Sequence, residues 1–301
     1  MHLKGIFNRD GGTFKTTDMD AFHEMATRIF TDAGHHFDCD IVSGNEVEDA
    51  IRSTADARSF DGMIVGGGDG TVSLATGVLY GHDKLLGVVP AGTMNLFARS
   101  IGLPLDIEDA LSVLANGKPA KVDVATMNGR TFIHQFSAGL HATMIRNREG
   151  IEYSSRFGKI SASTRAWIDS LMSVPEMHVR YESPERSGEG VFSLVGVSNN
   201  RIHSNALPFT DRPQGGVLAV YLVKAVELDT VAGLVMDFFA GHLENNENVI
   251  MFETDRIDIE FLEGTIDQSI DGDPLDEVRS VSLEQHPRAI NVIVPADSEL
   301  S

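Results

Sequence analysis

An aspartate stands inside a run of glycines at 66–70, which reads Gly-Gly-Gly-Asp-Gly and follows the apolar run Met-Ile-Val at 63–65. A glycine-rich turn after a buried strand lets backbone N–H groups close on a phosphate, at the positive end of the following helix. A carboxylate beside a phosphate is repelled unless a metal ion or an acceptor hydroxyl lies between them. Asp69 in this loop therefore favours phosphoryl transfer over simple phosphate binding. Taken alone, the loop is also compatible with a tight turn that carries a solvated aspartate.

The spacing of these glycines differs from that of two common phosphate-binding motifs. A P-loop ends in Gly-Lys-Ser or Gly-Lys-Thr, and the Gly-Lys-Pro at 117–119 lacks that context. In the dinucleotide-binding fingerprint the third glycine comes one residue later than Gly70 does here. A second turn, Pro-Ala-Gly-Thr at 90–93, follows another apolar run at 85–89 and precedes a helical pattern. The chain thus carries two related strand-turn-helix segments.

Together the segments GGGDGTV at 66–72 and PAGTMNLFARSIGLP at 90–104 resemble the diacylglycerol kinase catalytic-domain family. That family includes bacterial lipid kinases and sphingosine kinases, and it is distantly similar to NAD kinases, which share the Gly-Gly-Asp-Gly-Thr loop. The resemblance implies a lipid kinase that uses ATP and Mg²⁺, with the metal ion bridging the phosphates. It implies that Asp69 positions metal or phosphate, and it leaves the metal ligands themselves unknown.

The resemblance also implies which residues bind the nucleotide, and all of them fall in turns after expected strands. They are Asn8, Ser43, Gly67, Gly68, Gly70, Thr71, Gly92, Thr93 and Asn95. Near the end of the chain, Ile-Asp-Gly-Asp-Pro at 270–274 is similar to the family's Asp-Gly-Glu motif, with Asp273 in place of the glutamate. By this resemblance Asp271 is the general base that takes the proton from the attacking lipid hydroxyl. The Asp-Gly pair alone is also typical of a hairpin turn.

Several polar positions depart from the family pattern. They are Ser73 and Leu74 after the first loop, Leu96 after the second, His141 in a Gly-Leu-His-Ala segment, and Gln214 with Ala219 in a region that carries acidic magnesium ligands in some bacterial members. These departures are consistent with weak activity or with another substrate, so two rival functions stay open. One is a kinase of a soluble acceptor such as NAD, and the other is a catalytically weak regulator that binds nucleotide.

Alternating strands and helices must position these residues in the first part of the chain. Strands are expected at 2–7, 37–42, 63–65 and 85–89, and helices at 19–30, 46–58 and 107–115. Short connections between such elements predict a parallel sheet that is covered by helices on both faces. The loops at the carboxyl ends of its strands then meet at one crevice, where open α/β sheets bind ligands.

The pattern becomes mostly β from Lys121 onward. Strands that alternate apolar and polar residues, as half-buried antiparallel strands do, are expected at 131–137, 177–182, 191–197, 218–223, 249–253, 257–262 and 266–270. Helical spacing at 153–174 and 230–242 interrupts them, and a hairpin loop is expected at 183–190.

We therefore predict an α/β protein with two domains. The first is a Rossmann-like, parallel-sheet nucleotide domain, similar to that of NAD kinases and diacylglycerol kinases. It spans 1–122 and binds ATP, and the segment 288–301 can pack back on it. The second is an antiparallel β-rich domain, a β-sandwich, which spans 123–287 and faces the lipid substrate.

Composition limits the partners and the location. The 301-residue chain has a formal net charge of −20, which argues against nucleic acid, since binding a phosphate backbone needs a basic surface. A single cysteine, Cys39, excludes an internal disulfide and suits a reducing compartment. No metal-binding spacing links it with His35 and His36, which we interpret as loop residues.

The apolar run in the first twelve residues is too short for a signal peptide, and no apolar run approaches the ~20 residues of a membrane span. We expect a cytoplasmic protein that meets its lipid by transient, peripheral contact with the inner face of the membrane. Diacylglycerol, a sphingoid base and phosphatidylglycerol are all compatible acceptors, because an apolar cleft discriminates little between acyl chains. The oligomeric state is open, and a homodimer is one option.

Overall fold

The computed structural model describes residues 1–149, 174–202, 209–226, 230, 233–234, 236–237, 242–263 and 266–301. The chain forms two units. Three segments build the first unit, and they are Met1–Val124, Phe209–Gly216 and His286–Ser301. Two segments, Ala125–Pro208 and Val217–Gln285, build the second. Within the described residues, no helix is both long and apolar enough to span a bilayer.

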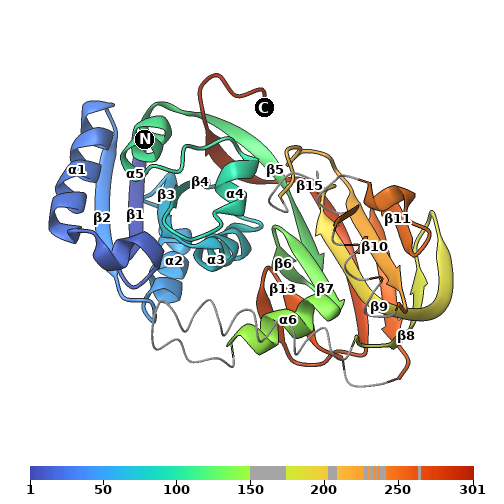
Figure 1. Ribbon diagram of the computed structural model, residues 1–301. Helices are drawn as coiled ribbons and strands as arrows, with labels where there is room; N and C mark the ends of the chain where they lie inside the picture. Colours follow the sequence, from blue (N-terminus) through green and yellow to red (C-terminus); the bar gives the residue numbers. More distant parts are fainter. Residues whose placement is uncertain are drawn as a thin grey trace. The chain divides into compact units, whose positions relative to one another are not determined.

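A parallel sheet forms the centre of the first unit (Figure 1). Its strands are β1 (His2–Asn8), β2 (His36–Val42), β3 (Gly62–Gly67) and β4 (Leu85–Pro90), in the order β4-β3-β1-β2. β1 pairs in parallel with both β2 and β3, and β3 pairs in parallel with β4. Every residue of β3 is buried, as expected for a strand that is covered on both faces.

The helices of the first unit include two packed pairs. The helices are α1 (Met19–Asp32), α2 (Val47–Asp56), α3 (Asp69–Leu79), α4 (Leu96–Ser100) and α5 (Ile107–Asn116). α1 packs against α5, and α2 packs against α3, as expected for the two faces of a doubly wound sheet. Aspartate caps begin two of them, because Asp18 accepts the first free N–H groups of α1 and Asp106 those of α5.

Antiparallel strands build the second unit. They are β6 (Arg130–Phe132), β7 (Gln135–Gly139), β8 (Met177–Glu182), β9 (Ser187–Asn199), β10 (Leu218–Lys224), β11 (Val249–Thr254), β12 (Arg256–Phe261), β13 (Gln268–Ile270) and β14 (Asp273–Leu275). The long strand β9 pairs with β7, β8 and β10. Alternate residues pack into one core, which includes Phe132, Phe136, Phe192 and Phe261.

A few elements complete the two units. Helix α6 (Leu140–Glu149) follows β7, and a short 3-10 helix, η2 (Leu243–Asn245), precedes β11. The strands β5 (Lys118–Met127) and β15 (Ser280–Val294) each contribute residues to both units. In the first unit the end of β15 runs parallel to β4, with Asn291 beside Leu85.

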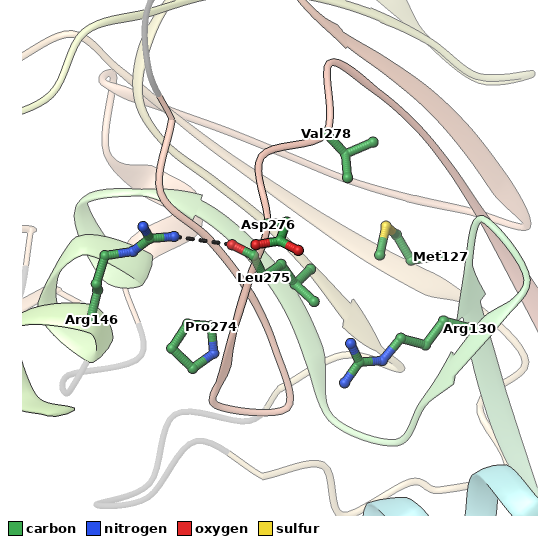
Figure 2. A pocket seen from close by; sticks show the side chains of 7 residues that line it. All are labelled: Met127, Arg130, Arg146, Pro274, Leu275, Asp276 and Val278. Carbon is green, nitrogen blue, oxygen red and sulfur yellow. Dashed lines mark hydrogen bonds between the residues drawn. The ribbon is translucent and has the colours of Figure 1, made fainter.

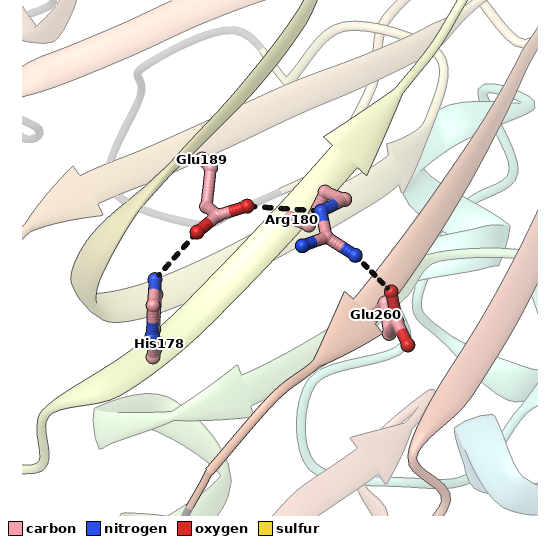
Figure 3. A network of polar contacts seen from close by, with 4 residues as sticks. All are labelled: His178, Arg180, Glu189 and Glu260. Carbon is pink, nitrogen blue, oxygen red and sulfur yellow. Dashed lines mark hydrogen bonds and ion pairs between the residues drawn. The ribbon is translucent and has the colours of Figure 1, made fainter.

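Charged side chains pair across one face of the second unit (Figure 3). Arg180 lies opposite Glu189 of β9 and Glu260 of β12, and its guanidinium donates to both carboxylates at 2.9 Å. His178 Nε2 lies 3.0 Å from the other oxygen of Glu189. The hydrogen bond from Arg180 is the main cause that lowers the pKa of Glu189. Because these side chains are largely exposed, the pairs favour this strand register more than they add to stability.

The predicted fold class is confirmed, with parallel strands in the first unit and antiparallel strands in the second. The hairpin expected at 183–190 is present between β8 and β9, but its loop is shorter, because β9 begins at Ser187 and Gly188 pairs with Tyr181 of β8. A Cβ at Gly188 would lie 2.7 Å from the Tyr181 hydroxyl, so the glycine makes room for this ring. The strand expected at 131–137 is divided into β6 and β7.

The segment Phe209–Gly216 also departs from expectation. The prediction places it in the second domain, whereas it lies in the first unit. The reason is Asp123, whose backbone N–H donates to the Pro213 carbonyl at 2.8 Å and whose Oδ2 accepts from the Gly216 N–H at 2.7 Å.

Two further expectations concern histidines and helices. His36 is the first residue of β2, so its interpretation as a loop residue is wrong. The helix expected at 153–174 lies outside the described residues except at its last position. In the helix expected at 230–242, the described residues 230, 233–234 and 236–237 are helical.

Candidate active site

The first glycine loop carries the chain from β3 into α3. Gly68 precedes the helix in an extended conformation, with φ −86° and ψ −179°, and Asp69 occupies the first helical turn. N–H groups of a first turn have no partner inside their own helix, and they lie at the positive end of its dipole. The start of α3 can therefore bind an anionic group.

The glycines of this loop serve different purposes. A Cβ on Gly66 would lie 2.4 Å from Phe7 Cδ1, and one on Gly67 would lie 2.5 Å from Thr71 Oγ1. These two residues must be glycine because the backbone is packed against its neighbours. A Cβ on Gly70 would meet no atom within 4 Å. The loop is therefore open at Gly70, at the first turn of α3.

Three loops meet beside this turn. A Cβ on Gly92, in the loop after β4, would lie 2.6 Å from the Gly68 Cα. The loop after β1 continues into the 3-10 helix η1 (Gly12–Thr16), and its Thr13 N–H donates to the Ala91 carbonyl at 2.8 Å. Gly12 has φ +42°, and a Cβ there would lie 1.7 Å from the same carbonyl oxygen. Backbone contacts thus hold the loops after β1, β3 and β4 together.

Side chains of the predicted site fix these loops. Asp69 Oδ1 accepts a hydrogen bond from the Leu96 N–H at 2.7 Å, which ties the first loop to the start of α4. Asn95 adopts a left-handed conformation with φ 51°, and its amide side chain bonds both the N–H and the carbonyl of Gly92. Thr93 is exposed, so its hydroxyl is accessible to a ligand.

The predicted residues after β1 and β2 also make local contacts. Asn8 Oδ1 accepts from the Asp10 N–H at 3.0 Å, and Asp10 Oδ2 accepts from the Gly44 N–H at 2.8 Å. The loops after β1 and β2 are therefore joined. The Ser43 hydroxyl and N–H both donate to the Glu46 carboxylate, and the hydroxyl bond is the main cause that lowers the pKa of Glu46. These bonds fix the turn between β2 and α2.

Asp271 lies in the two-residue turn between β13 and β14. Asp271 and Gly272 have φ values of 50° and 88°, as a type I′ hairpin requires. The carboxylate accepts three backbone hydrogen bonds, from Ile133 at 3.0 Å, His134 at 2.8 Å and Gln135 at 3.1 Å. These bonds explain why the expected strand 131–137 breaks between β6 and β7. The turn thus connects β13 to β14 and also binds the segment between β6 and β7.

Asp273, on the other side of this turn, has a different environment. Burial raises the pKa of Asp273, the nearby charge of Asp271 adds to the rise, and Arg130 opposes it. A carboxyl group with a raised pKa is a better proton acceptor near neutral pH, provided that it is ionised. The sequence singled out Asp273 only as a replacement for glutamate, because its burial depends on the folded second unit.

A pocket of about 550 Å³ adjoins this hairpin (Figure 2). Its lining residues come from β5, β6, α6, β14 and the chain that follows, and they are Met127, Arg130, Arg146, Pro274, Leu275, Asp276 and Val278. Arg146 is partly engaged, since it pairs with Asp267 at 2.9 Å and donates to the Leu275 carbonyl at 3.0 Å. The sequence did not predict this pocket, because its walls come from separate parts of the chain.

His141, one of the departures from the family pattern, lies in the first turn of α6. Its Nδ1 is 2.8 Å from the Ser137 hydroxyl, which is also 2.8 Å from the Ser269 hydroxyl. Burial lowers the pKa of His141, so its neutral form is favoured. The imidazole here stabilises a small network of hydroxyl groups.

The predicted site residues divide between the two units. The nine residues predicted to bind nucleotide lie in the first unit, at or just after the carboxyl ends of β1, β2, β3 and β4. Asp69 is among them in space, whereas Asp271 lies in the second unit.

Comparison with known proteins agrees with this arrangement of strands and loops. Residues 2–127 match the family model of the diacylglycerol kinase catalytic domain. The chain is 26% identical over 308 aligned residues to a probable lipid kinase YegS-like from Pseudomonas aeruginosa, covering 100% of this chain and 94% of the relative. It is 27% identical to a diacylglycerol kinase from Staphylococcus carnosus, covering 80% of this chain and 78% of the relative.

Solved structures share the fold. A diacylglycerol kinase from Bacillus anthracis superposes with a TM-score of 0.72 at 19% identity, covering 97% of this chain and 96% of that one. A yeast NADH kinase complexed with NADH superposes with a TM-score of 0.52 at 9% identity, covering 99% of this chain and 84% of that one. Both classes of kinase thus have this fold, and the fold alone does not choose between their acceptors.

Proposed function

Because residues 2–127 belong to the diacylglycerol kinase catalytic-domain family, we propose that the chain is an ATP-dependent lipid kinase. It transfers the γ-phosphate of ATP to the hydroxyl of diacylglycerol or a related lipid. The observation that carries this proposal is the junction of three loops at the start of α3, where the backbone is open at Gly70. In this proposal the first unit binds ATP and the second binds the lipid.

The first unit fits a nucleotide triphosphate. The first turn of α3 supplies N–H groups for phosphate oxygens, and Thr71 and the exposed Thr93 supply hydroxyl groups. Asp69 offers the oxygen donor that Mg²⁺ prefers, within the same loop. When bound, Mg²⁺ would neutralise the charge of the phosphates during transfer. Asn8 and Asn95 bond backbone groups of their own loops, and Ser43 bonds the Glu46 carboxylate.

The acceptor hydroxyl needs a base, and the β13–β14 hairpin offers two carboxylates. Asp271 is the base by family resemblance, but three N–H groups already bind it. The raised pKa of Asp273 makes this neighbour the second candidate. We assign proton removal to Asp271 and propose that Asp273 supports it electrostatically.

The acceptor is the part of the proposal that most needs a direct test. Purified protein is incubated with γ-labelled ATP and Mg²⁺, once in mixed micelles of candidate lipids and once with NAD in solution. Label in the organic phase that is lost in Asp271→Asn and Asp69→Asn would support the lipid kinase. Circular dichroism of each variant checks that it is folded.

Other outcomes would overturn the proposal. Label that appears only in NAD would identify a kinase of a soluble acceptor. ATP binding without any labelled product would favour the nucleotide-binding regulator. Leu74 and Leu96, which stand at polar positions of the family pattern, are consistent with that function.

A further inference from the structure

Two histidines and an aspartate gather at the amino ends of β1 and β2. His2 and His36 are partners in the parallel register of these strands. Asp38 follows His36 by two residues, so its side chain lies on the same face of the sheet. The rings of His2 and His36 are 4.3 Å apart between centroids, at an angle of 64°. Three side chains that can each bind a metal ion thus lie next to one another.

The distances suit one small cation. His2 Nε2 lies 3.1 Å from Asp38 Oδ2, and His36 Nε2 lies 3.9 Å from Asp38 Oδ1. The ligand atoms of all three residues lie within 4.8 Å of one another. Ligands at Zn–N and Zn–O distances of about 2.0–2.1 Å in a tetrahedral arrangement are about 3.3 Å apart. The observed separations bracket that value, so small rotations of the exposed side chains would complete the geometry.

We propose that His2, His36 and Asp38 bind one divalent transition-metal ion of the Zn²⁺ class. Two imidazoles and a carboxylate are typical ligands of Zn²⁺ and its neighbours, whereas Mg²⁺ and Ca²⁺ prefer oxygen ligands alone. The exposed fractions of the three side chains are 29%, 74% and 43%. Solvent therefore reaches the site, and water supplies the remaining ligands.

Neighbouring residues hold His2 in place, and nearby carboxylates favour binding of a cation. The His2 N–H donates to Asp61 Oδ2 at 2.7 Å, and its ring packs edge-on against Phe60 at 4.6 Å. Lys4, the nearest lysine on this face of β1, is paired with Asp40 at 2.7 Å. Its charge is thereby balanced, and the carboxylate of Asp61 adds negative charge beside the site.

This site is distinct from the one proposed to bind ATP and Mg²⁺. His2 and Asn8 are the two ends of β1, which are about 20 Å apart at the rise of a β-strand. The proposed ion would link β2, the edge strand of the parallel sheet, to β1 at the end that carries no nucleotide loop. The sequence alone missed it, because His2 is 34 positions away from His36 and no local spacing joins them.

The test uses the full chain without a histidine tag, after removal of metals with a chelator. Calorimetric titration with ZnCl₂ is expected to give one ion per chain, and titration with Co²⁺ is expected to give the visible spectrum of a site with nitrogen ligands. Loss of a residue that only bonds a metal ligand weakens metal binding by ~10–100-fold. His36→Ala removes a ligand itself, so it should weaken Zn²⁺ binding by at least as much. Asp38→Asn should also weaken it.

His23→Ala is the matched control, because His23 is an exposed histidine on α1, outside the cluster. It should bind Zn²⁺ like the wild type. Thermal unfolding provides a second readout, since Zn²⁺ should raise the Tm of the wild type and of His23→Ala but not that of His36→Ala. Equal Zn²⁺ affinity in the wild type and His36→Ala, or no affinity in either, would overturn the proposal. Kinase activity does not enter this test, so the two proposals fail separately.

Discussion

Asp271 and Asp273 differ in what surrounds their carboxylates, although one residue separates them. Three backbone N–H groups hold Asp271, whereas burial and the neighbouring carboxylate raise the pKa of Asp273. One carboxylate is thus fixed by backbone N–H groups, and the other lies where burial disfavours its charged form. A variant at either position can reduce activity for a different reason, so stability must be measured beside it.

We expect Asp271→Ala to destabilise the protein, and Asp273→Asn to leave stability nearly unchanged. The first variant leaves three N–H groups without their acceptor, and each such loss costs about 1–3 kcal/mol when the group is buried. Urea unfolding measures the difference. Kinase activity should fall in both variants. Full activity in Asp273→Asn would remove this residue from the chemistry.

His141 should make stability depend on pH. Burial lowers its pKa from the ordinary value of 6.5, so the unfolded chain binds a proton more readily than the folded one. The stabilising contribution is present above pH 6.5 and is lost as the pH falls below it. In His141→Gln the free energy of unfolding should decrease less between pH 7 and pH 5.5 than in the wild type. His23→Gln, on the surface, should keep the wild-type slope.

Cys39 should be inert in the folded protein. Burial is the main cause that raises the pKa of its thiol to about 12, Asp40 adds to the rise, and Lys4 opposes it. Since the thiolate is the reactive form, a thiol reagent at pH 8 should label the native chain slowly and the urea-unfolded chain rapidly. Rapid labelling without urea would show that β2 opens locally at this position.

At the scale of elements, glycines in the loops around α3 serve two purposes: Gly12 allows close packing between loops, and Gly70 leaves the start of α3 open. Gly12→Ala would place a Cβ 1.7 Å from the Ala91 carbonyl oxygen at a φ of +42°. We expect it to force the loops after β1 and β4 apart and to lower the Tm. Gly70→Ala meets no atom within 4 Å, so its Tm should stay close to that of the wild type.

The two variants should both bind ATP more weakly, but only one should be destabilised. A methyl group on Gly70 would point into the opening that the proposal assigns to phosphate. Differential scanning fluorimetry with and without ATP measures both effects. Unchanged ATP affinity in Gly70→Ala would argue against a phosphate at this turn.

The same loops show how far the sequence could predict the site. Their glycines, Asp69 and the apolar runs before them mark turns after buried strands, and these local signals placed the loops correctly. The sequence could not show that Asn95 and Ser43 use their polar groups on neighbouring residues, because those contacts depend on the folded loops. Asp271 was recognised by its motif, but its three N–H donors come from residues more than 130 positions away.

At the scale of the whole molecule, Asp123 joins the three segments of the first unit. The sequence predicted that 288–301 can return to this part of the chain, but nothing local indicated that Phe209–Gly216 also does so. Asp123 is only 2% exposed, and its carboxylate accepts from Gly216 at 2.7 Å and from Arg288 at 2.8 Å. A buried carboxylate is stable only with such partners.

Asp123→Ala should therefore loosen both returning segments at once. Loss of the carboxylate leaves the N–H groups of Gly216 and Arg288 without their acceptor, at a cost of about 2–6 kcal/mol for the two. Asp297→Ala, an exposed aspartate in the last segment, is the control and should have little effect. Hydrogen exchange should become faster around both 213–216 and 286–290. Faster exchange in only one of them would show that Asp123 does not couple the segments, because a shared carboxylate must release both together.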